Sequence, residues 1–298
     1  MLKGLALTPP EIGRISIGRV VEKNGKRLPE ADDEFTITTQ VQTARGWLNH
    51  PLDATLRKTP ESKLRAIPVR LLFSDPDLNL RANYSMFDRK TGRPLCVGNG
   101  EVCKRSTASG MQTLPCPAPE GCEMGAAGGC KPYGRLNVRV GNEDELGTFV
   151  FRTTGYNSIR TLSSRLSYFH AVSGGLLPTL ALELRLRGKS TTQSHRAPIY
   201  YVDLTLRTGT TLPEAIEAAK AEDETRRQKG FVQGALDQAA RAGLALGTFE
   251  DSVEEGSAVI EEFYNAEVAP EPNQRTGTLK DQHGLASKLS AKAEALGE

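Results

Sequence analysis

The sequence predicts an α+β fold with a mainly antiparallel sheet, one packed amphipathic helix and a C-terminal helical tail. Three observations carry this prediction. Alternating apolar and polar residues mark segments in the first 153 positions and again after position 179, a helical period starts at Asn157, and the composition turns to Ala, Glu and Lys after Thr208. Because strands and helices do not alternate regularly, a doubly wound parallel sheet is not expected.

The expected strands are short and are joined by turn residues. Asn24-Gly25 predicts an opening hairpin, and the Asp-Pro sequence at 74–77 predicts a turn between two further strands. The segments expected to be extended are 14–22, 34–41, 67–73, 78–87, 135–140, 146–153, 180–186 and 198–207.

The packed helix is expected from Asn157 to Gly174-Gly175. Its apolar residues, Ile159, Leu162, Leu166 and Phe169, recur at three- and four-residue steps, which places them on one face. Asn157 or Ser158 can cap the first turn, and the glycine pair ends the helix.

The chain is expected to divide into three parts. Residues 1–208 form the α+β core with an insertion at about 94–133, residues 209–265 form an acidic helical extension, and residues 266–298 form a mobile tail with room for a short helix at 285–296. Residues 1–208 hold 29 Lys and Arg against 19 Asp and Glu, whereas residues 209–298 hold 9 against 17. The first part can therefore attract phosphate groups and the last part repels them, although two solvated surfaces of opposite sign explain the counts as well.

All five cysteines lie between positions 96 and 130, in a segment rich in Gly and Pro that has little means of forming a hydrophobic core. In a reducing compartment, clustered thiolates are preferred ligands of zinc, and a metal can hold such a segment together. We expect Cys116, Cys122 and Cys130 to bind Zn²⁺, with Cys96 as the preferred fourth ligand and Cys103 as its substitute. Free thiols or disulfides remain alternatives. Four thiolates leave no open coordination position, so the expected zinc is structural.

No catalytic motif is found. The four histidines are far apart, and the chain lacks a Walker sequence, a complete dinucleotide-binding glycine loop and a Gly-x-Ser-x-Gly elbow. We therefore expect a protein that is not an enzyme. No apolar run approaches the roughly 18 residues that would span a bilayer, so a cytoplasmic protein without membrane contact is expected.

A basic surface is expected to contact nucleic acid. Arg185, Arg187 and Lys189 alternate along one strand and so share a face. The loop that follows adds hydroxyls and Arg196, and of Tyr200 and Tyr201 one can stack on a base while the other packs inward. The residues expected at this surface are Arg152, Arg160, Arg165, Arg185, Arg187, Lys189, Arg196 and Tyr200. An exposed polar sheet face with a mobile loop is the alternative.

Five segments together resemble the phage recombination directionality factors that partner large serine integrases. These segments are Leu95-Cys-Val-Gly-Asn-Gly100, Leu114-Pro-Cys116, Gly121-Cys122, Cys130-Lys-Pro-Tyr-Gly-Arg-Leu136 and Phe149-Val-Phe-Arg-Thr-Thr-Gly-Tyr-Asn-Ser-Ile159. The similarity covers about residues 10–207. Closer relatives look like proteins of conjugative plasmids and integrative elements that are described as hydrolase or metal-binding protein.

The resemblance implies a protein without catalytic activity that binds an integrase or other recombinase and changes which attachment sites it recombines. It also implies metal ligands at Cys96, Cys116, Cys122 and Cys130, with Cys103 extra to the pattern. The expected function is thus that of a zinc-containing accessory protein of DNA recombination on a phage, plasmid or integrative element, with DNA and a recombinase as partners. The alternatives are a general single-stranded DNA or RNA-binding protein and a metal-dependent hydrolase.

Overall fold

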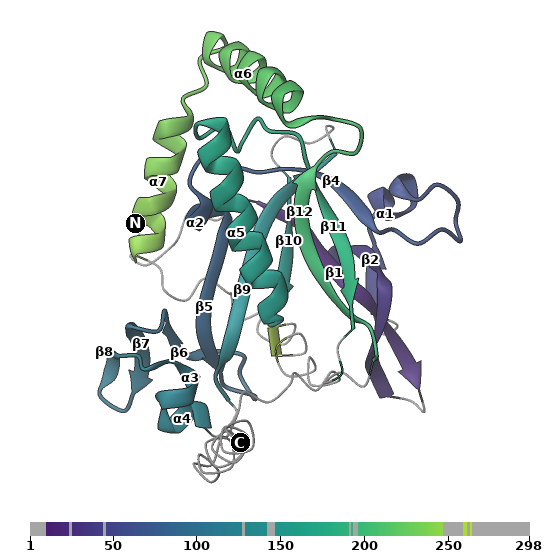
Figure 1. Cartoon of the computed structure of the whole chain (residues 1–298). Coiled ribbons are helices and arrows are strands. Elements are labelled where there is room, and N and C mark those ends of the chain that lie inside the picture. Colours follow the sequence, from purple (N-terminus) through teal and green to yellow (C-terminus); the bar gives the residue numbers. More distant parts are fainter. Residues whose placement is uncertain are drawn as a thin grey trace, which may run out of the picture.

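The fold was obtained as a computed structural model, which describes residues 10–23, 26–43, 46–126, 129–141, 147–190, 192, 196–246, 259–260 and 263. It confirms the α+β class (Figure 1). The strands are β1 (Glu11–Lys23), β2 (Lys26–Thr43), β3 (Gly46–Asn49), β4 (Ala66–Arg70), β5 (Leu80–Phe87), β6 (Pro94–Gly98), β7 (Val102–Thr107), β8 (Gly110–Pro115), β9 (Lys131–Val140), β10 (Thr148–Thr153), β11 (Leu182–Lys189) and β12 (Ile199–Leu206). The helices are α1 (Pro51–Leu56), α2 (Pro76–Asn79), α3 (Ala118–Gly121), α4 (Glu123–Ala126), α5 (Tyr156–Ser173), α6 (Leu212–Gln228) and α7 (Gln233–Leu246).

Strand β9 joins three arms of the sheet. One edge of β9 pairs with β10, which continues through β1 and β2 to β3. The other edge pairs with β5, which leads through β6 and β7 to β8, and, near its end, with β4, which leads to β11 and β12. In the described residues, every strand pairing is antiparallel except that of β1 with β10. The sheet is therefore mostly antiparallel, as the sequence predicts.

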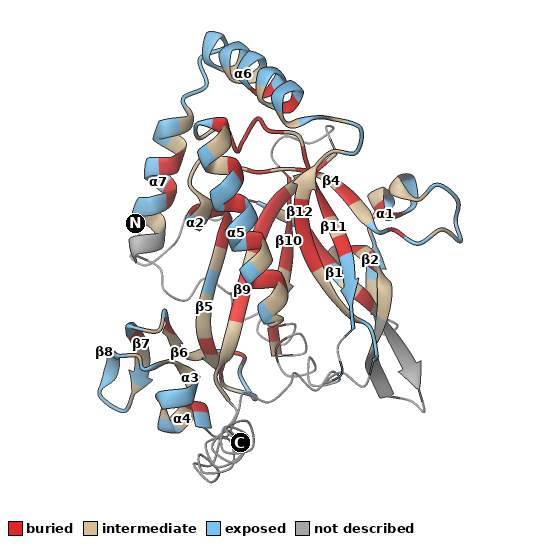
Figure 2. Cartoon of the chain, in the orientation of Figure 1, coloured by how far each residue is buried: buried red, intermediate tan, exposed pale blue. Residues whose placement is uncertain are grey.

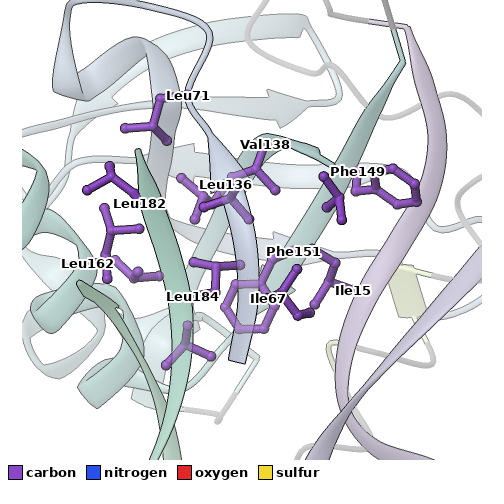
Figure 3. Packing of buried hydrophobic residues seen from close by; sticks show 14 of the residues in the cluster. Ile15, Ile67, Leu71, Leu136, Val138, Phe149, Phe151, Leu162, Leu182 and Leu184 are labelled. Atoms are coloured by element: carbon purple, nitrogen blue, oxygen red, sulfur yellow. The ribbon is translucent and has the colours of Figure 1, made fainter. Parts of the chain in front are cut away.

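The main core lies where these arms and α5 meet (Figures 2 and 3). The alternating apolar residues of the strands supply most of it, and the predicted amphipathic face of α5 supplies Leu162, Leu166 and Phe169. Gly174 ends α5 in the left-handed conformation, at φ 67°, as expected of a glycine after a helix. The Ser158 hydroxyl accepts a hydrogen bond of 3.1 Å from the Val202 amide, so α5 is bonded to β12. Core residues from the sheet include Ile15, Phe35, Ile67, Leu136, Val138, Phe149, Phe151, Leu182 and Leu184.

The structure differs from the predicted turn at residues 74–77. The residues expected to turn at 74–77 begin the short helix α2, because the Asp75 side chain accepts a hydrogen bond from the Asp77 amide and caps it. Strand β5 therefore begins at Leu80 instead of position 78. The expected turn at Asn24-Gly25, residues 142–146, and the expected tail at 266–298 with its short helix at 285–296 lie outside the described residues.

Helices α6 and α7 form the expected helical extension and pack on the sheet domain. Ala215 and Ala219 of α6 belong to the main core, and Glu222 forms an ion pair of 2.8 Å with Arg70. Helix α7 packs through Ala240 on Phe73 and Leu78, in a separate apolar cluster. No helix in the described part of the chain is long and apolar enough to cross a membrane.

We expect Leu136→Ala to lower the free energy of unfolding by about 2–5 kcal/mol, because it leaves a cavity in the core next to β9. Urea denaturation followed by circular dichroism measures this change. The matched control is Leu48→Ala on β3, whose residue is 46% exposed and should change stability by less than about 0.5 kcal/mol. Equal effects of the two substitutions would contradict the described core.

Candidate functional site: the cysteine lobe and the basic face

The cysteine lobe, defined as residues 94–126 with Cys130, continues the sheet beyond β5. Strands β6, β7 and β8 form an antiparallel extension, followed by the short helices α3 and α4 (Figure 1). The expectation that this segment is a loop without regular structure is thus partly wrong, since half of the segment is β-structure. A glycine permits the tight turn between β7 and β8, where Gly110 has φ 105°.

Two of the five thiols lie on paired strands of the lobe. Cys96 lies within β6 and is 8% exposed, while Cys103 lies on β7 and is 2% exposed. Cys103 pairs with Gly98 of β6, and a Cβ atom at Gly98 would lie 2.7 Å from the Cys103 Cβ and 2.8 Å from the Cys116 Sγ. Only a glycine at position 98 therefore lets the Cys116 thiol approach this face of the strands.

The other thiols surround the same face. The Cys116 amide donates a hydrogen bond of 2.8 Å to the Glu101 carbonyl, which ties the end of β8 back to the start of β7. Burial, together with the charges of Cys96, Cys116 and Cys122, raises the pKa of Cys130 to about 12. Of the four cysteines expected to bind zinc, Cys130 thus lies close enough to the other three for their charges to affect its pKa.

Arg105 lies among the thiols and was missed in the sequence analysis. It is paired with Cys96 across β6 and β7, and its guanidinium donates to the Cys122 Sγ over 3.6 Å. The hydrogen bond with Cys96 raises the pKa of Arg105 above its ordinary value. The signal was available, since Arg105 follows Cys103 by two positions and residues two apart on a strand share a face.

The pKa values of two thiols of the lobe, Cys122 and Cys103, are shifted in opposite directions. The backbone N–H of Gly125 lowers the pKa of Cys122, with further help from the Met124 N–H and the Arg105 guanidinium. Burial, together with the hydrogen bond with Cys96, raises the pKa of Cys103 to about 11. Without a metal, Cys122 is therefore the more readily ionised of the two.

The donor set of the lobe suits a soft metal ion, since it consists of thiols gathered within one small substructure. In the described residues, however, no three His, Cys, Asp or Glu side chains form a group that could hold a metal ion. The zinc ion and the choice of ligands therefore stay predictions. The Cys103 Cβ and the Cys116 Sγ both lie against Gly98, which keeps both of these cysteines open as ligands.

The basic face, defined by the residues expected to contact nucleic acid, is brought together in part around α5, β11 and β12. Arg185, Arg187 and Lys189 do share one face of β11, opposite Asp203, Tyr201 and Ile199 of β12. Arg160 and Arg165 lie on α5, and Arg196 is exposed beyond β11, with φ 63°. Arg152 is different, because its side chain on β10 is 3% exposed and lies 3.6 Å from the Glu11 carboxylate.

Carboxylates neutralise much of the basic face. The buried Asp203 carboxylate binds Arg165 at 3.0 Å and Arg187 at 3.2 Å, one guanidinium on each oxygen. The buried Glu183 carboxylate binds Arg185 and also accepts a hydrogen bond from the Thr208 amide. The excess of cations counted in the sequence therefore overstates the charge that this face offers to a phosphate backbone.

The two tyrosines of β12 face opposite ways, as expected. Tyr200, the one chosen as a nucleic-acid contact, packs partly buried against the main core, where its ring also contacts Gly188. Tyr201 lies on the polar face, with the Lys189 ammonium 5.9 Å from its ring centroid. Lys189 also donates a hydrogen bond of 2.7 Å to Asn157. Of the pair, Tyr201 is thus the better placed for a ligand on this face.

The comparisons with known proteins give one finding. A family model described as Gp3-like, recombination directionality factor-like, matches residues 12–207. The match runs from β1 through β12 and includes the whole cysteine lobe, whereas α6, α7 and the segment near Phe263 lie outside it. No curated protein and no solved structure matches the chain.

In metal-free protein at about pH 8, we expect iodoacetamide to alkylate Cys122 faster than Cys103 or Cys130, because only Cys122 has a lowered pKa. Arg105→Ala removes a donor and a positive charge, so it should raise the Cys122 pKa and slow the reaction. Peptide mass spectrometry of time points gives the rates. Lys104→Ala, next along β7, is the control and should leave the order unchanged; fastest labelling at Cys103 would contradict the described contacts.

Proposed function

Because the chain belongs to the Gp3-like, recombination directionality factor-like family, we propose that it is a non-enzymatic accessory protein of DNA recombination on a phage, plasmid or integrative element. It would modulate a recombinase or integrase through contacts with both the protein and its DNA. The observation that carries the proposal is the family match over the complete sheet, including the cysteine lobe. An accessory factor of this kind redirects a reaction by binding one recombinase–DNA arrangement better than another.

The cysteine lobe is the part best suited to a protein partner. It continues the sheet at one end, and β8 is its last strand among the described residues. The face of β7 and β8 opposite the thiols carries Val102 and Met111, which are 53% and 51% exposed. Large exposed apolar residues beside an unpaired strand edge are typical of protein interaction surfaces.

Contact with DNA is proposed as a supporting role of the basic face. Single-strand binding proteins combine a cationic groove with several stacked aromatic residues. Here Asp203 and Glu183 neutralise three arginines, and Tyr200 packs against the core. These features favour an accessory factor with a protein partner over the alternative of a general single-stranded DNA or RNA-binding protein, and no observation in the described residues favours the hydrolase alternative.

We propose that a structural Zn²⁺ braces the lobe, held by Cys96, Cys116, Cys122 and Cys130. The common face of the thiols and the space left by Gly98 support the fit. A tetrathiolate zinc site carries a net negative charge, which Arg105 at 3.6 Å from the Cys122 Sγ would offset. With four protein ligands, the metal would supply stability to the lobe and no reactive position.

Native mass spectrometry of the full chain is expected to show one zinc ion, because four thiolates complete one tetrahedral site. Cys116→Ser should lose the ion, and Cys103→Ser is the matched control that should keep it. A chain that carries no zinc after expression in zinc-containing medium would contradict the proposed metal. Loss of zinc from Cys103→Ser with retention in Cys96→Ser would instead exchange these two in the ligand set.

Binding to labelled duplex DNA should be weak alone and should rise by about 10-fold or more when the recombinase of the same element is present. The reason is that the protein partner supplies contacts that the partly neutralised basic face lacks. Fluorescence anisotropy at two salt concentrations measures this, because a phosphate-dominated binder loses affinity steeply with salt. Tight, salt-sensitive binding that is indifferent to the recombinase would favour the single-stranded or general nucleic-acid binder.

A further inference from the structure

A segment from the C-terminal part of the chain packs at the base of the cysteine lobe. Val259 and Phe263 are both fully buried, and together with Phe87 and Tyr133 they form an apolar cluster separate from the main core. The Phe263 ring centroid lies 4.9 Å from that of Phe87 and 5.8 Å from that of Tyr133, both in edge-on geometry. This is favourable packing for aromatic rings.

The spacing of the two buried residues is that of a helix face. Val259, Ile260 and Phe263 are helical, and residues four apart on a helix lie on the same side, which here is the side toward the sheet. The Lys131 ammonium, at the start of β9, lies 5.9 Å from the Phe263 ring centroid. The segment thus packs on an aromatic pair, Phe87 and Tyr133, with the Lys131 ammonium beside it, and we call these three residues the receptor.

The position of the receptor connects it with the proposed docking lobe. Phe87 is the last residue of β5 and pairs with Pro94 of β6, and Tyr133 lies three positions after Cys130. Both rings lie within the part matched by the family model, while Val259 and Phe263 lie more than fifty residues beyond its end at position 207. The family core thus contains the aromatic receptor, and a segment outside that core covers it.

We propose that Val259 and Phe263 form an intramolecular ligand that covers a helix-docking site made by Phe87, Tyr133 and Lys131, and that a short helix of the recombinase with the same apolar–aromatic spacing displaces it. The inference rests on the proposed function for the identity of the partner, but not for the covered site itself. The bound segment shows which shape and chemistry the site accepts. A tethered ligand acts at an effective concentration near millimolar, so a free helix competes poorly until the segment is weakened.

The test uses the full chain and a fluorescent peptide of residues 254–267. The Phe263→Ala chain should bind this peptide about 10-fold or more tightly than the wild-type chain, because the intramolecular ligand has lost its aromatic anchor. Adding Phe87→Ala to that chain should abolish the gain, and a peptide carrying Phe263→Ala should not bind. Phe231→Ala, at an exposed aromatic residue of the same part of the chain, is the matched control and should behave as wild type.

Circular dichroism shows whether the Phe263→Ala chain is folded. If it is not folded, Val259→Ala serves as a milder variant, which should bind the peptide with an affinity between those of the wild-type chain and Phe263→Ala. Equal binding of the peptide to wild-type and variant chains, or no binding to either folded variant, would overturn the covered site. A second arm measures recombinase binding. Tighter binding to Phe263→Ala than to wild type supports displacement by the recombinase, whereas peptide binding without any effect on the recombinase would overturn that partner and leave the covered site standing.

Discussion

The structure depends on strand β9 and on its pairing along both edges. Its residues from Lys131 to Val140 bond β10 on one side and β5 and β4 on the other, so three arms of the sheet meet at a single strand. Leu136 and Val138 of this strand lie in the main core, and Tyr133 lies in the second apolar cluster. The same strand thus anchors the core, begins next to Cys130 and holds the receptor for the C-terminal segment.

The cysteine lobe extends from this framework and gathers five ionisable thiols around Arg105. Burial and mutual repulsion raise the pKa of Cys103 and Cys130, so these thiols are costly to ionise together without a cation nearby. Arg105 supplies one such cation beside Cys96 and Cys122. A bound metal would supply the larger compensation that several thiolates require, which is why the lobe is proposed to depend on one.

Much of the fold could be predicted from local patterns in the sequence. Alternation identified eight of the strands, and the three- and four-residue steps identified α5, because both signals arise within one element. It did not identify β3 or the three strands of the cysteine lobe, β6, β7 and β8. The parallel pairing of β1 with β10 and the docking of Phe263 on Phe87 could not be predicted, since each joins residues more than 100 positions apart. At the basic face, the sequence pattern identified the cations but not the carboxylates that neutralise them. Asp203 lies between Arg165 and Arg187 because β12 and α5 pack together in the folded chain.

We propose that this family member changes the outcome of a recombinase without performing chemistry itself. The most direct measurement is a recombination assay with the purified recombinase of the same element and defined pairs of attachment sites, in the presence and absence of this protein. We expect the added protein to change which pair is recombined and to yield no product without the recombinase. An unchanged distribution of products, at protein concentrations that saturate binding to the recombinase, would contradict this proposed role.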